Sequence, residues 1–114
     1  MIHQMGLYKA PFQSIKAGRK TVEVRLNDEK REKLRIGDNI IFTKLPEKDD
    51  QLEVEIINLT IYPTFKEMYT KISAQAFDSI GETIDDLLAS TYEIYSKKQE
   101  EQFGTLAIEI KHIS

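Results

Sequence analysis

The sequence contains no cysteine, which excludes disulfide bonds, cysteine-ligated zinc and iron–sulfur clusters. Only two histidines are present, His3 and His112, one near each end of the chain, so we expect no multi-histidine metal site. No apolar stretch approaches the ~20 residues that cross a bilayer. The first residues lack the charged start and long apolar run of a secretory signal, so we expect a cytoplasmic protein without membrane association.

Internal repeats, low-complexity tracts and linkers rich in proline, glycine or serine are also absent, so we predict a single domain over residues 1–114. With 40% hydrophobic and 31% charged residues, the chain can build one core under a solvated surface. This composition argues against intrinsic disorder. The sequence has no Walker loop, dinucleotide fingerprint or catalytic triad, and we expect no cofactor.

The net charge of −3 is distributed unevenly along the chain. Residues 1–44 carry ten Lys and Arg against five Asp and Glu, a net +5, whereas residues 45–114 carry six against 14, a net −8. Such a split can mark a local surface for an anionic ligand on an otherwise acidic protein. The halves can equally interleave their charges in the folded chain, and the counts do not decide between these interpretations.

Hydrophobic periodicity predicts an α+β domain with about five strands and three short helices, forming a small sheet that is closed or nearly closed. Alternation with period two predicts strands over residues 21–26, 39–43, 52–61 and 103–110. Helical spacing and caps predict helices over residues 10–17, 64–72 and 82–95. The doublet Ile56-Ile57 breaks the alternation, so we expect a bulge near Asn58.

Four charged residues, Arg19, Lys20, Glu23 and Arg25, lie within the bend between the first predicted helix and strand. Alternation places Glu23 and Arg25 on one strand face about 7 Å apart, close enough to pair, while Lys20 can swing toward that face. A carboxylate between two cations can build a polar pocket. It can also be an ordinary exposed salt bridge, and the spacing alone favours this second interpretation.

The order of motifs resembles the ASCH (activating signal cointegrator homology) family. The resemblance covers nearly the whole chain and rests on three segments: Gly18-x-Lys20-x-x-Glu23-x-Arg25, Ile36-Gly37-Asp38-x-Ile40-x-Phe42 and Phe103-Gly104-x-Leu106-Ala107-Ile108. It implies a PUA-like β-barrel whose first motif lines a cleft for RNA or a nucleotide-like ligand.

The resemblance also implies roles for the charged residues of the first motif. Lys20 would contact a phosphate or a base oxygen, and Glu23 would accept hydrogen bonds from a base or sugar. Arg25 would hold Glu23 or bind phosphate through two hydrogen bonds, with Arg19 beside them. Tyr95 is a candidate for stacking on a base.

A branch of this family hydrolyses N4-acetylcytidine with a lysine, a threonine three positions later and a downstream glutamate. Lys20 matches the lysine, but Glu23 occupies the threonine position and cannot supply an alcohol nucleophile. Glu82 is the nearest candidate for the downstream acid, although an acid in a first helical turn is also simply favourable. Lys20 and Glu23 are therefore the catalytic candidates if the protein is a hydrolase of a modified nucleoside or of RNA, and whether it is an enzyme stays open.

Other polar segments have simpler interpretations. The basic residues of the 30–35 run are expected in a solvated loop, and at least one of Tyr92 and Tyr95 is expected to pack in the core. Residues 96–102 are expected to form a polar spacer. The acidic pair Glu100-Glu101 could serve a protein partner, but nothing in the sequence identifies one.

Overall fold

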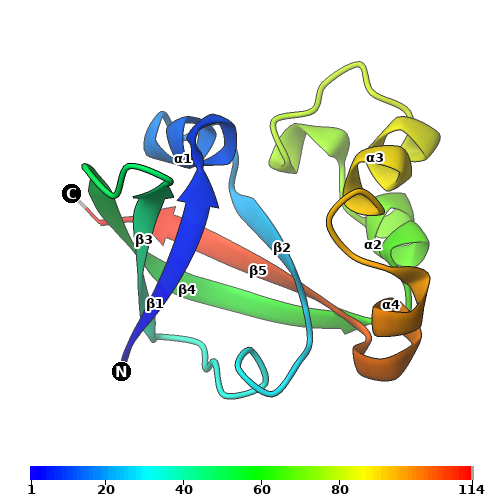
Figure 1. Cartoon of the computed structure of the whole chain (residues 1–114), viewed down its shortest axis with the longest axis horizontal. Helices are drawn as coiled ribbons and strands as arrows, with labels where there is room; N and C mark the ends of the chain where they lie inside the picture. Colours follow the sequence, from blue (N-terminus) through cyan, green and yellow to red (C-terminus); the bar gives the residue numbers. More distant parts are fainter. Residues whose placement is uncertain (114) are drawn as a thin grey trace.

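A computed structural model describes residues 1–113, which form one five-stranded mixed sheet in the order β1-β3-β4-β5-β2 (Figure 1). The strands are β1 (Ile2–Tyr8), β2 (Val22–Leu26), β3 (Asn39–Leu45), β4 (Gln51–Tyr62) and β5 (Thr105–His112). The helices are α1 (Lys9–Lys16), α2 (Phe65–Lys71), α3 (Ile84–Thr91) and α4 (Lys97–Phe103), with a 3₁₀ turn at Ala74–Ala76. None of the helices in this described part of the chain has the length and apolar character needed to cross a membrane.

The sheet curls into a half-barrel whose two edges are β1 and β2. β1 runs parallel to β3, and every other pairing is antiparallel. The concave side buries one apolar cluster, in which Phe12 and Ile15 of α1 pack with residues such as Phe42, Val54 and Ile108. A second cluster fills the space between the sheet and the group α2, α3 and α4, which lies together on one side of the molecule (Figure 1).

Each strand predicted from alternation is present, with boundaries moved by one or two residues. The expected bulge is also present, because the register of β4 against β5 shifts between Ile56 and Asn58. Strand β1 was not predicted from the sequence. It pairs with β3, a segment more than thirty positions away in the chain, and most of its side chains are not fully buried, so its alternation is weak.

Side-chain caps mark the starts of α2, α3 and α4, whereas α1 starts without one. Thr64 accepts a hydrogen bond from the N–H of Glu67 at 3.1 Å, as predicted for the start of α2. The predicted helix over residues 82–95 is wrong at both ends, since Thr83 and Asp86 form a capping box and α3 spans only Ile84–Thr91. The polar spacer is wrong as well: Ser96 and Gln99 form a second capping box that starts α4.

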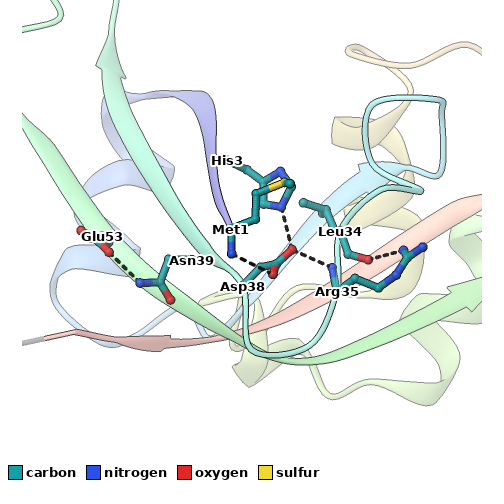
Figure 2. A network of polar contacts seen from close by, with 7 residues as sticks. All are labelled: Met1, His3, Leu34, Arg35, Asp38, Asn39 and Glu53. Carbon is teal, nitrogen blue, oxygen red and sulfur yellow. Dashed lines mark hydrogen bonds and ion pairs between the residues drawn. The ribbon is translucent and has the colours of Figure 1, made fainter.

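Asp38, in the turn before β3, ties down the start of β1 (Figure 2). Its carboxylate accepts from the Met1 amine at 3.3 Å, from His3 Nε2 at 2.8 Å and from the Arg35 N–H at 3.2 Å. The hydrogen bond from His3, the largest of these effects, helps to hold the pKa of Asp38 below its usual range. This network fixes the strand whose other end reaches the cavity described next.

Candidate nucleotide-binding cavity

A cavity of about 410 Å³ lies along the free edge of β2. It touches three consecutive residues of that strand, Glu23, Val24 and Arg25, although their side chains alternate between opposite faces of the sheet. The last residues of β1, Gly6 to Tyr8, form the facing wall. The cavity therefore occupies the seam where the half-barrel stays open between its two edge strands.

Lys20, Glu23 and Arg25 converge on this cavity. Lys20 Nζ lies 2.8 Å from Glu23 Oε1, while Arg25 Nε and Nη2 lie 2.9 and 2.8 Å from Glu23 Oε2. The three side chains are 15%, 5% and 13% exposed in the same order, so the group is sheltered rather than spread over the surface. We call this group the ion triad; it carries one net positive charge.

The turn after α1, the alternation of side chains along β2 and a contact with β1 bring the ion triad together. The turn after α1, with Gly18 at a φ of 79°, brings Lys20 to the start of β2. There the backbone of Lys20 forms an isolated antiparallel β-bridge with Phe77. Alternation along β2 then places Glu23 and Arg25 on the same face. The guanidinium of Arg25 crosses the seam, and its Nη2 donates to the Gly6 carbonyl of β1 at 2.9 Å.

The electrostatics of the ion triad keep Glu23 ionised. Burial by itself would raise the pKa of this carboxyl, but the charges and hydrogen bonds of Lys20 and Arg25 outweigh burial and lower the pKa below its usual value. Both carboxylate oxygens are engaged. Within residues 1–113, Arg25 Nη1 has no hydrogen-bond partner, and Lys20 Nζ bonds only to Glu23, so N–H donors remain for a ligand.

The wall contributed by α2 and α3 is largely apolar and aromatic. Tyr95 lies on it and stacks against Phe65 at 5.7 Å between ring centres, and burial raises the pKa of the Tyr95 phenol. Thr91 Oγ1 donates to the Leu87 carbonyl at 2.8 Å, so the Tyr69 hydroxyl, 2.7 Å away, donates to Thr91. The Thr91 hydroxyl therefore already donates its hydrogen bond to the helix backbone.

Not every residue predicted for the site lies in this cavity. Arg19 points away from it, is 57% exposed and pairs with Asp78 at 3.1 Å beside a separate depression. Glu82 does line the cavity, but it precedes the cap of α3, so it does not lie in the first turn of the helix.

The remaining polar candidates are accounted for by structural contacts. Tyr92 packs edge-on against Phe65, and its hydroxyl donates to Glu100; Tyr92 and Tyr95 are both partly buried and pack against the second apolar cluster. Glu100 is buried and also accepts from the Phe65 N–H at 2.7 Å, so it caps the start of α2 and is not free for a partner. In the basic run, Arg31 pairs with Asp28 at 3.1 Å.

Sequence reasoning missed the β1 wall, formed by Gly6, Leu7 and Tyr8, and the contribution of Thr91 and Ile94 from the α3 side. Gly6 was the available signal, because a glycine inside a strand often marks a close approach of the backbone to another group. A Cβ at Gly6 would lie 2.5 Å from Leu45 Cδ1, so a larger residue here would have to displace the Leu45 side chain.

Comparison with known proteins assigns the chain to a family. The family model described as ASCH domain matches residues 5–114, whereas no curated protein matches. The crystal structure of hypothetical protein PH0355 is similar, with 34% identity, a TM-score of 0.88 and coverage of 99% of this chain and 100% of that one. The solution structure of protein PF0455 from Pyrococcus furiosus has 29% identity, a TM-score of 0.76 and coverage of 100% and 99%.

A mutant of the ZmASCH protein from Zymomonas mobilis is more distant, with 11% identity, a TM-score of 0.63 and coverage of 96% of this chain and 67% of that one. At this identity the likeness concerns the fold alone, and it confirms the α+β, PUA-like arrangement of a curled five-stranded sheet with flanking helices. The family model covers almost the entire chain in one match. The chain therefore belongs to the ASCH domain family.

Proposed function

We propose that this protein binds RNA or a nucleotide-like ligand in the cavity between β1 and β2. The ASCH family is generally associated with RNA binding, and the observation that carries the proposal is the ion triad sheltered on the cavity wall. The volume of about 410 Å³ falls within the ~300–1,000 Å³ typical of small-molecule sites. A mostly apolar wall with a few convergent polar groups is also typical of such sites.

In this proposal Lys20 and Arg25 contact the ligand, and Glu23 positions them. Both carboxylate oxygens of Glu23 are engaged by the two cations. This supports a role in positioning Lys20 and Arg25, and not one in accepting hydrogen bonds from a base or sugar. The free Nη1 of Arg25 can donate to a phosphate oxygen, and Lys20 adds a point charge. Tyr95 offers an aromatic edge on the opposite wall, while Arg19 is not part of the proposed site.

The alternative, hydrolysis of N4-acetylcytidine or RNA in the same cavity, has less support from the geometry. Glu23 is held ionised by two cations, so it is a weak general base and a poor general acid near neutral pH. The Thr91 hydroxyl of the cavity wall gives its proton to a helix carbonyl. Incubation with N4-acetylcytidine and with single-stranded RNA tests this alternative, and turnover that disappears in Glu23→Gln would establish it.

Titration of short single-stranded RNAs against wild type, Lys20→Ala and Arg19→Ala at two salt concentrations tests the binding proposal. Both substitutions remove one positive charge from neighbouring positions, so non-specific attraction falls equally, but only Lys20 lines the cavity. We expect Lys20→Ala to weaken binding about tenfold or more and to reduce the salt dependence by about one counterion. Arg19→Ala should stay within about twofold of wild type.

Equal weakening by the two substitutions would show that the contacts are diffuse surface attraction and would contradict the proposal. Circular dichroism of each variant checks that the fold persists. Absence of RNA and nucleotide binding to the wild type would also reject it.

A further inference from the structure

The strand edges that border the cavity carry peptide groups that the sheet does not use. Along a strand, the N–H and C=O of alternate residues point to opposite sides. On either side of β2, the Thr21 carbonyl accepts from the Ile110 N–H and the Asn27 N–H donates to the Gly104 carbonyl, so the odd-numbered residues of the strand direct these groups toward β5. Val24, between Glu23 and Arg25, therefore directs its N–H and C=O away from the sheet.

The same reasoning applies to β1. The Met1 carbonyl accepts from the Asn39 N–H, so the odd-numbered residues of β1 face β3. Gly6 accordingly faces the seam, as its hydrogen bond from Arg25 requires. Since Gly6 has no side chain and still lines the cavity, the wall at this point is its backbone.

We propose that the cavity reads one unstacked nucleobase edge-on, through the N–H and C=O of Val24 and the N–H of Gly6. This inference rests on the proposed function and names its ligand class: single-stranded RNA with an exposed base, or a free nucleotide. Each nucleobase carries neighbouring donors and acceptors on its edge, and a strand residue that faces outward offers one donor and one acceptor side by side. The phosphate then lies at Lys20 and Arg25, which border the same cavity.

The cavity favours a base over the obvious alternative, an added β-strand from another chain. Open strand edges do pair readily with other strands. Here, however, the Arg25 guanidinium spans the seam to Gly6, and the α3 wall closes the side beyond β2, so an extended chain has no continuous path. Base-specific recognition of RNA generally requires an unpaired base that can be presented in this way.

Amide hydrogen exchange of the intact, ¹⁵N-labelled protein tests the proposal without altering the backbone. In the free protein, the Val24 and Gly6 amides should exchange much faster than those of Glu23 and Arg25, which donate to β5. The four ribonucleoside 5′-monophosphates should slow exchange at Val24 and Gly6, and ribose 5-phosphate, which lacks a base, should not. At least one nucleotide should bind about tenfold or more tightly than ribose 5-phosphate.

Three results would overturn the inference, and they separate it from the proposed function. Nucleotide binding that shifts the Lys20 and Arg25 side-chain signals but leaves Val24 exchange unchanged would mean recognition of phosphate alone, with the proposed function intact. Protection of Val24 in the free protein would mean that the edge is already paired with another chain. Absence of binding by the nucleotides and by single-stranded RNA would reject the proposed function together with the base-reading edge.

Discussion

Replacement of Glu23 by glutamine tests whether the ion triad is a prearranged buried unit. The substitution keeps the shape of the side chain but removes the carboxylate charge that pairs with both Lys20 and Arg25, whose side chains are 15% and 13% exposed. Breaking a buried ion pair by removing one partner typically costs about 3–5 kcal/mol, because the remaining charge is left uncompensated. Glutamine retains one acceptor oxygen, so we expect the lower end, about 3 kcal/mol.

For a domain of 114 residues, each kcal/mol changes the melting temperature by about 4 °C, so Glu23→Gln should melt about 12 °C below wild type. Thermal unfolding followed by circular dichroism near pH 7 measures this difference. Glu82→Gln is the matched control, since Glu82 borders the same cavity but is exposed and has no ion-pair partner within residues 1–113. It should stay within about 2 °C of wild type.

The difference between wild type and Glu23→Gln should depend on pH in one direction. The pKa of Glu23 is lowered in the folded protein from an ordinary value of 4.5. Its ionisation therefore contributes stability above that value, and this contribution is lost as the pH falls through the lower, folded-state pKa. A variant as stable as wild type at pH 7, or a difference that grows on acidification, would refute the account of the ion triad.

Two further predictions concern the helical layer. Glu100→Gln should lower the pKa of Tyr92 from about 12 toward its ordinary 10, because the neighbouring carboxylate charge is lost. The decrease should be partial, since the phenol stays partly buried. Absorbance titration of the phenols measures this pKa, with Glu101→Gln at an exposed position as the control. In wild type, the raised pKa of Tyr92 means that stability falls as the pH rises from 10 through 12, and an unchanged pKa in Glu100→Gln would contradict the assigned contact. Thr83→Ala should cost about 1 kcal/mol by removing the α3 cap, and an unshifted midpoint of urea unfolding would contradict a start of that helix at Ile84.

The parts of the fold that sequence reasoning predicted are those set by local pattern. The strand from Val22 to Leu26, the bulge near Asn58 and the Thr64 cap each depend on a few neighbouring residues, and each is present. The start of α3 was equally readable, since Thr83 and Asp86 have capping-box spacing. Helix α4 also carries such a box at Ser96, but its buried face uses a glutamate, so hydrophobic periodicity does not reveal it.

The candidate site also has one part that local sequence predicts and another that depends on long-range contacts. Lys20, Glu23 and Arg25 are close in sequence, so their clustering could be predicted from the alternation of one strand. Whether they lie in a pocket or on the surface depends on Gly6, which approaches Arg25 from a strand nineteen positions earlier. A glycine in a strand can hint at a close approach, but no local pattern identifies Arg25 as the partner. The exposed orientation of Arg19 likewise depends on Asp78, a long-range partner from the loop before α3.

Chemical-shift mapping of the ¹⁵N-labelled protein with a short single-stranded RNA tests the central claim most directly. If the seam between β1 and β2 binds the RNA, the largest shifts will fall on residues 6–8, 20, 23–25, 91, 94 and 95, which border the cavity. Shifts confined to the basic run at residues 30–35, or no shifts at RNA concentrations well above those of the protein, would contradict it.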